Sequence, residues 1–154
     1  RQRLGDLAKP GPENPLAILD ETGAIACLRA TAEAQVRESG AINYLGDVPE
    51  GAMVRITIAD RAAILEGCRE SISKAFADYP HGKTPGAALL FSCAARKLLL
   101  GTRTGEEMAV VQSVMGSQIP VCGFYGYGEI GPLDTRDRVS KFHNETFVSL
   151  IMGT

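Results

Sequence analysis

The chain has 154 residues, a formal net charge of −2 at pH 7, 45% hydrophobic residues and 22% charged residues. This composition is typical of one globular domain and excludes a largely disordered chain. Basic residues are interrupted by acidic ones, as Arg136 and Arg138 are by Asp134 and Asp137, so no basic face is available for nucleic acid. No apolar run approaches the roughly 20 residues of a membrane-spanning helix, so we expect no membrane partner.

The four cysteines are Cys27, Cys68, Cys93 and Cys122, and no two of them are close in sequence. Their spacing excludes a zinc motif built from closely spaced cysteine pairs, and we expect no metal ion and no cofactor. Isolated cysteines with mostly apolar neighbours favour a reducing compartment. We therefore expect a cytoplasmic protein without disulfides.

The first residues of the chain differ in pattern from the rest. Residues 1–14 carry prolines and glycines without hydrophobic periodicity, which predicts a linker or N-terminal arm. Residues 15–154 then form the domain. Because the chain begins at Arg1 rather than at a methionine, we expect it to be a fragment of a longer protein.

Strand and turn signals follow this arm. Residues 16–19 and 24–29 flank the polar, glycine-containing segment 20–23 and predict a β-hairpin. A short strand is expected at 41–45. At 52–58 apolar and other side chains alternate with the period of a strand.

Two segments have helical periodicity. Asp60 is placed to cap the first helix, which Pro80 ends. Its apolar stripe consists of Leu65, Cys68, Ile72 and Phe76. Thr104 and Glu107 match a capping box at the start of the second helix, and Gly116 follows its end. The second stripe consists of Met108, Val111, Val114 and Met115.

Three further apolar runs, at 87–91, 119–125 and 146–152, predict additional strands. Strands and helices do not alternate strictly along the chain. The predicted fold class is therefore α+β, with a single mixed, largely antiparallel sheet and two main helices packed on it.

The segment 121–132, which reads Val-Cys-Gly-Phe-Tyr-Gly-Tyr-Gly-Glu-Ile-Gly-Pro, is the densest in groups that recognise a ligand. Its glycines allow close backbone approach or positive φ, and its polar and aromatic side chains can face a bound molecule. Gly126, Gly128 and Gly131 match the spacing of a dinucleotide-binding fingerprint. No helical pattern follows Pro132, so we reject nucleotide binding.

Several side chains here are candidate ligand contacts, and each also has a structural interpretation. Glu129 could accept a ligand amine or cap backbone amides, and Arg96 could receive a carboxylate in a pairing that suits a zwitterion. His143 could respond to protons in a pocket or be satisfied by backbone groups at a strand end. Tyr125 and Tyr127 are expected on one face of a strand, as contacts or as half-buried sheet residues.

Cys93 permits a different class of function. A thiol at the start of a helix, together with His143 and Asn144, would suit a cysteine-dependent hydrolase, although a buried structural cysteine is the favoured interpretation. A further alternative is a protein–protein interaction module without a small-molecule pocket, in which the aromatic strand is an exposed patch.

Three segments resemble the C-terminal half of the FIST domain, named for F-box and intracellular signal transduction proteins. They are Gly-Ala-Ala-Leu-Leu-Phe-Ser-Cys at 86–93, the glycine-aromatic-glutamate block at 123–132, and Phe-His-Asn-Glu-Thr at 142–146. The resemblance extends over residues 15–153. Gly126 stands where the family pattern often has threonine, which removes one hydroxyl group from the expected site.

The resemblance implies a non-enzymatic sensory domain that binds a small ligand, with amino acids proposed, and takes part in signal transduction. Its expected partners are the ligand, the N-terminal half of the FIST domain and an attached output domain. The ligand contacts that we expect in this chain are Cys93, Arg96, Tyr125, Tyr127, Glu129, His143 and Asn144.

Overall fold

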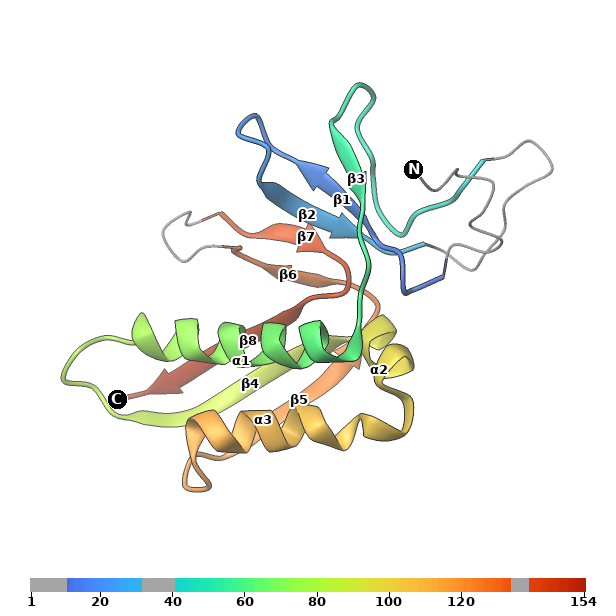
Figure 1. The fold of residues 1–154 in the computed structure, drawn as a ribbon. Coiled ribbons are helices and arrows are strands. Elements are labelled where there is room, and N and C mark those ends of the chain that lie inside the picture. Colours follow the sequence, from blue (N-terminus) through green and yellow to red (C-terminus); the bar gives the residue numbers. More distant parts are fainter. Residues whose placement is uncertain (1–10, 32–40, 134–138) are drawn as a thin grey trace.

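The structure has the predicted α+β architecture (Figure 1). It is a computed structural model and describes residues 11–31, 41–133 and 139–154. Its strands are β1 (Leu16–Leu19), β2 (Ile25–Arg29), β3 (Val54–Ile56), β4 (Pro85–Cys93), β5 (Val121–Gly126), β6 (Glu129–Gly131), β7 (Lys141–His143) and β8 (Phe147–Gly153). The helices are α1 (Arg61–Ala77), α2 (Ala94–Leu100) and α3 (Gly105–Met115), with a short 3-10 turn η2 (Gly101–Arg103) before α3.

The central sheet has the strand order β5-β4-β8. β4 pairs in parallel with β5 and antiparallel with β8, and α1 and α3 cover one face of this sheet (Figure 1). The core between these helices and the sheet consists of Cys68, Ile72, Ala88, Leu90, Val111 and Met115. β5 runs so close to β4 that a Cβ atom added to Gly123 would lie 2.8 Å from the carbonyl carbon of Leu90. A side chain is therefore excluded at this position.

The opposite face of the central sheet carries no helix among the described residues, and we call it the open face (Figure 1). The strand register places Leu89, Phe91, Phe124, Leu150 and Met152 on it. The rings of Phe91 and Phe124 meet edge to face with their centroids 5.3 Å apart. Phe124 nevertheless remains 66% exposed, so the open face is an apolar surface in contact with solvent.

A second, antiparallel sheet has the order β2-β1-β3 and contains the predicted hairpin. Asp20 Oδ1 accepts hydrogen bonds from the amides of Thr22, at 2.8 Å, and Ala24, at 3.0 Å. Gly23 has a φ of +84°, which favours glycine. The local sequence of the loop therefore accounts for its closure.

β6 and β7 form a two-stranded antiparallel sheet between the other two sheets (Figure 1). The amide of Asn144 donates to the carbonyl of Leu28 in β2, at 3.2 Å. Phe147 already pairs with Ser92 of β4. The chain thus passes from β7 to β8 within residues 144–146, at the junction of the three sheets.

The strands are distributed over three sheets, so the predicted detail of a single sheet is met only loosely. Residues 41–45 form no strand, because Tyr44 makes only an isolated bridge with Thr31. Of the expected N-terminal arm, residues 1–10 lie outside the described ranges. In its described part, the backbone carbonyl of Glu13 accepts a hydrogen bond from the amide of Ala59, at 2.9 Å.

The two main helices are confirmed, with two changes in their inward faces. Asp60 caps α1 as predicted by accepting from the amide of Ala63 at 2.8 Å, but Ile64 rather than Leu65 is buried. On α3, Met108 is 46% exposed because Glu107 points inward instead. None of the helices in the described ranges is both long and apolar enough to cross a membrane.

Candidate functional site

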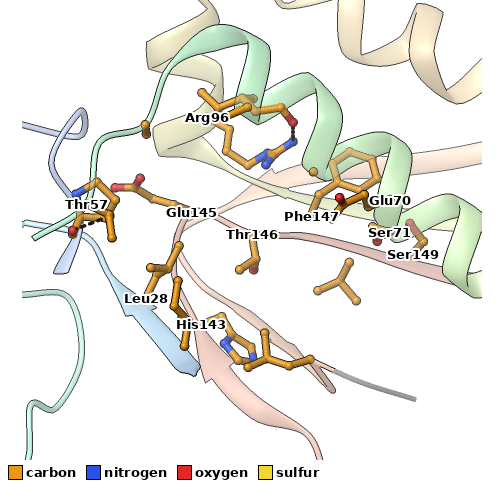
Figure 2. A pocket seen from close by; sticks show the side chains of 18 of the residues that line it. Leu28, Thr57, Glu70, Ser71, Arg96, His143, Glu145, Thr146, Phe147 and Ser149 are labelled. Carbon is orange, nitrogen blue, oxygen red and sulfur yellow. Dashed lines mark hydrogen bonds between the residues drawn. The ribbon is translucent and has the colours of Figure 1, made fainter. Parts of the chain in front are cut away.

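A cavity of about 470 Å³ lies between α1, β8 and the β7–β8 connection, and we call it the α1–β8 cavity (Figure 2). Its volume falls within the range of about 300–1,000 Å³ that is typical of small-molecule sites. Most of its wall is apolar, and it includes Ile25, Leu28, Ile64, Phe147 and Val148. A small organic molecule with an apolar body would therefore fit it.

One face of α1 forms a long wall of this cavity. The residues concerned include Ala63, Gly67, Glu70, Ser71 and Lys74, whose separations of 4, 7, 8 and 11 positions from Ala63 place them on one side of a helix. At 1.5 Å per residue this face is about 16 Å long. Figure 2 shows Glu145 beside Thr57 at one end and Ser71 with Ser149 at the other, where their hydroxyl oxygens lie 3.0 Å apart.

Glu145 is held in the cavity wall by its two neighbours. Asn144 Oδ1 accepts from the amide of Ala30 at 3.2 Å, in addition to the bond from the Asn144 amide to β2. Thr146 donates from its amide and its hydroxyl to Glu129 Oε2, at 3.3 and 2.9 Å. The Thr146 carbonyl accepts from the amide of Cys93 at 3.1 Å. The backbone on both sides of Glu145 is thus fixed to different sheets.

Glu145 has two energetically unfavourable features in the free protein. Its φ is +59°, in the left-handed region that non-glycine residues rarely occupy. Both of its carboxyl oxygens are buried and have no hydrogen-bond partner in the described part of the chain. Burial raises the pKa of this carboxyl to about 8, an effect that Arg96 opposes and that Glu129 and Glu13 reinforce. Such outliers concentrate at functional sites.

His143 lines the same cavity and is 2% exposed. Its Nε2 lies 3.1 Å from the carbonyl oxygen of Gly131, which can only accept, so Nε2 carries the proton. Burial lowers the pKa of His143 and favours the neutral ring. Nδ1 then presents a lone pair, and it has no partner among the described residues.

Arg96 also lines the cavity, but its guanidinium already has a carboxylate partner. Nε and Nη2 donate to Glu107 Oε1 at 3.0 and 2.8 Å, and both side chains are 5% exposed. Nη2 also donates to the carbonyl of Ile64 at 2.8 Å. The predicted capping box is therefore wrong, because the Glu107 carboxylate turns inward to a buried cation and not back to the Thr104 amide.

Two other predicted contacts support this arrangement from outside the α1–β8 cavity. The Tyr125 hydroxyl donates to Glu107 Oε2 at 2.7 Å. Glu129 is 3% exposed and accepts the hydrogen bond from the Thr146 hydroxyl. Together with Phe91 and Phe124 it lines a separate hollow of about 280 Å³. Glu129 is thus placed behind the wall of the cavity and not in it.

The remaining predicted contacts lie in different surroundings. Tyr127 follows the end of β5 and is 84% exposed, so it does not share a face with Tyr125. Asn144 is fully buried and bonded to backbone groups. Cys93 is buried, and burial followed by the nearby charge of Glu129 raises the pKa of its thiol to about 11. The thiol therefore remains protonated at neutral pH.

The structure thus brings His143 and Arg96 of the predicted set to one cavity and adds Glu145, which the sequence analysis did not select. Glu145 stands inside the Phe-His-Asn-Glu-Thr motif, so the signal was available in the sequence. Within residues 11–31, 41–133 and 139–154, no group of three or more His, Cys, Asp or Glu side chains could hold a metal ion.

An α+β domain with unpartnered polar groups around a cavity of this volume suits a ligand-binding module. Comparison with known families specifies the class: the sequence profile of the FIST C domain matches residues 5–132. The chain belongs to the FIST C domain family. FIST domains are sensory domains of signal transduction and are in general not enzymes. The match ends before the motif at 142–146.

The chain is also similar to longer mycobacterial proteins. It is 34% identical over 105 residues to an uncharacterized protein of Mycobacterium tuberculosis, and 30% identical over 104 residues to an uncharacterized protein of Mycobacterium bovis. Each alignment covers 68% of this chain and 26% of the relative. The chain thus spans about a quarter of the length of these curated relatives. No solved structure matches it.

Removing the carboxylate of Glu107 should strongly destabilise the domain. The substitution Glu107→Ala leaves the Arg96 guanidinium buried without a counter-charge, which typically lowers the free energy of unfolding by about 3–5 kcal/mol. The neighbouring Glu106→Ala, on the exposed surface, serves as control and should leave stability nearly unchanged. Urea denaturation measures both. Equal effects of the two substitutions would contradict a special role for the buried pair.

Replacing Glu145 should change how stability depends on pH. The folded carboxyl keeps its proton up to pH about 8, whereas the unfolded carboxyl loses it near its ordinary value of 4.5. Between these values the unfolded state binds fewer protons, so Glu145 lowers stability progressively as pH rises and lowers it fully above pH 8.

The variant Glu145→Gln should therefore resemble the wild type at pH 4 and exceed it in unfolding free energy at pH 9, by about 2–5 kcal/mol. Glu70→Gln, on the exposed part of the α1 wall, is the control and should show no such trend. A pH-independent difference between Glu145→Gln and the wild type would show that folding does not shift the pKa of Glu145.

Proposed function

We propose that this chain is the ligand-binding part of a cytoplasmic sensory domain, and that its α1–β8 cavity binds a small molecule. The observation that carries the proposal is Glu145, whose buried and unpartnered carboxyl lines the cavity in a strained backbone conformation. A ligand that hydrogen-bonds to this carboxyl offsets part of the unfavourable burial. Amino acids, which the family resemblance suggests, are small enough for the volume. The four free cysteines support a reducing compartment.

Ligand binding would be passed on through the connection between β7 and β8. Glu145 contacts the ligand, its neighbour Thr146 is bonded to Glu129, and Glu129 begins β6. A ligand that prefers one arrangement of this turn shifts the equilibrium between two positions of β6 and of the adjoining segment 123–132. An output module attached to the longer protein would respond to that shift.

Catalysis through a thiol is not supported by the surroundings of Cys93. Its thiol is buried, has a pKa of about 11, and does not line the cavity that contains His143. The chain therefore acts, in our proposal, by binding and not by a covalent reaction.

A thermal-shift screen with amino acids, amines and related metabolites tests the proposal. A ligand present at 100 times its dissociation constant adds about 2.7 kcal/mol, or about 5–10 °C for a domain of this size. The variant Ala63→Leu adds bulk to the α1 wall of the cavity and should reduce or abolish the shift. Ala62→Leu, whose side chain is exposed and outside the cavity, should retain it. A shift that survives undiminished in Ala63→Leu would place the site elsewhere.

A second candidate function is protein–protein interaction, and the open face favours it. Phe124, Leu150 and Met152 are 66%, 49% and 40% exposed on one surface. The chain spans about a quarter of its mycobacterial relatives, so this surface has a candidate occupant in the N-terminal FIST half of a longer protein. Burial of such aromatic side chains commonly dominates interface energies.

The substitution Phe124→Ser distinguishes docking through the open face from ligand binding in the α1–β8 cavity. In the isolated chain it should leave the melting temperature almost unchanged, whereas in a protein that includes the N-terminal half it should weaken docking by more than about 1 kcal/mol. Leu98→Ser is the control, because Leu98 is 73% exposed on α2, away from the open face. Scanning calorimetry of both proteins gives the comparison. The same small change for both variants in the longer protein would exclude docking through Phe124.

A further inference from the structure

The buried charges around the α1–β8 cavity do not balance. The buried acids near it are Glu107, Glu129 and Glu145, and the buried cation near it is Arg96. The other buried arginine, Arg29, donates to the backbone carbonyls of Leu28, Asp47 and Phe142 and does not line the cavity. This region of the described chain therefore has more buried carboxyl groups than buried cations.

Arg96 offers no uncompensated positive charge to a ligand carboxylate, because Glu107 already neutralises its guanidinium. Two of its nitrogens are bonded to Glu107 Oε1, one of these also reaches the Ile64 carbonyl, and its guanidinium lies 5.4 Å from the ring centroid of Phe147. The remaining nitrogen, Nη1, has no hydrogen bond in the described part of the chain. A ligand carboxylate bound there would place a further negative charge beside Glu107 and near Glu145, which is unfavourable in a buried site.

Glu145 has the opposite properties, because its carboxyl lines the cavity and both of its oxygens lack a partner in the described chain. An ammonium group has three donors and no acceptor, so it matches a carboxylate oxygen directly. The lone pair of His143 Nδ1 is a further acceptor in the same cavity. The buried unpartnered polar atoms named here are thus acceptors. Of the two cations that line the cavity, Arg96 is paired with Glu107, and Lys74 is exposed on the turn of α1 that follows Ser71.

We infer that the ligand of the α1–β8 cavity carries a net positive charge, as a primary amine with an apolar body and no free carboxylate, and that its ammonium group binds to Glu145. The inference rests on the proposed function, since it specifies the ligand of that same site. It distinguishes amines and amino-acid amides from zwitterionic amino acids, whose carboxylate finds no free cation beside Glu145.

Binding of such a ligand is coupled to proton release. The charged and titratable groups that act on Glu145 or line its cavity are Arg96 from α2, Glu129 from β6, neutral His143 from β7, Glu13 from the segment before β1, and the exposed Glu70 and Lys74 of α1. In the free protein burial keeps the pKa of Glu145 at about 8. At pH 7 an ammonium ligand therefore converts the carboxylic acid to a carboxylate, and one proton passes to solvent. Affinity for the amine should rise by about tenfold per pH unit up to pH 8.

Four compounds with the same apolar body test the inference at pH 7: leucine, leucinamide, 3-methylbutylamine and 4-methylpentanoate. Leucinamide and 3-methylbutylamine should raise the melting temperature, whereas leucine and 4-methylpentanoate should not. Glu145→Gln should lose the response to both amines. Glu66→Gln, which changes an exposed carboxylate on α1 outside the cavity, should keep it. Calorimetric titration of 3-methylbutylamine in two buffers with different ionisation enthalpies should report proton release from the wild type and none from Glu145→Gln.

The outcomes separate this inference from the proposed function. A larger shift with leucine than with leucinamide would overturn the inference and leave the sensory site standing, with a zwitterion as its ligand. An amine response that survives in Glu145→Gln would also overturn it. If no compound of this panel or of the wider screen shifts the melting temperature, both the inference and the proposed function fail.

Discussion

The ion pair between Arg96 and Glu107 connects every layer of the central unit. It joins α2 to α3, reaches α1 through the Ile64 carbonyl, and reaches the sheet through Ser92 and Tyr125, whose hydroxyls donate to Glu107. Its desolvation is offset in part because Arg96 Nη2 also donates to Ile64 and the Glu107 carboxylate also accepts from Ser92 and Tyr125. Glu107 also neutralises the positive charge of Arg96, the buried cation near the cavity. The electrostatic character of the site therefore follows from a contact that holds the fold together.

The β7–β8 connection places the site at the junction of the three sheets. Asn144 is fixed to the hairpin sheet, Thr146 is fixed to β6 and β4, and Glu145 between them faces the cavity. A change in the charge or the contacts of Glu145 thus acts on a segment whose two ends belong to different sheets. A change in the contacts of this one side chain can therefore alter the positions of strands that are far apart in sequence. A sensory domain requires such coupling.

Local sequence was sufficient for the elements whose stability depends on neighbours in the chain. The hairpin loop at 20–23, the Asp60 cap and the stop of α3 at Gly116 were predicted because each rests on turn or cap chemistry within a few residues. The third sheet was not predicted, because β6 and β7 are only three residues long and pair across a long connection.

The candidate site was less predictable because it depends on contacts between distant segments. Glu107 fits a capping box by spacing alone, but its carboxylate binds Arg96, and a buried guanidinium interacts with a carboxylate more strongly than a backbone amide does. Strand alternation placed Tyr127 with Tyr125, yet β5 ends at Gly126. The direction of Glu145 is set by a positive φ that no periodicity reveals.

That left-handed residue also has an evolutionary consequence. Glycine adopts positive φ without strain, and any glutamate codon becomes a glycine codon by a change of one base. A lineage that no longer needed the acid at position 145 could thus relieve the backbone and remove a buried carboxyl in one mutational step. If the proposed function holds, relatives that bind the ligand are expected to keep glutamate at this position, and relatives that keep only the fold are free to have glycine there.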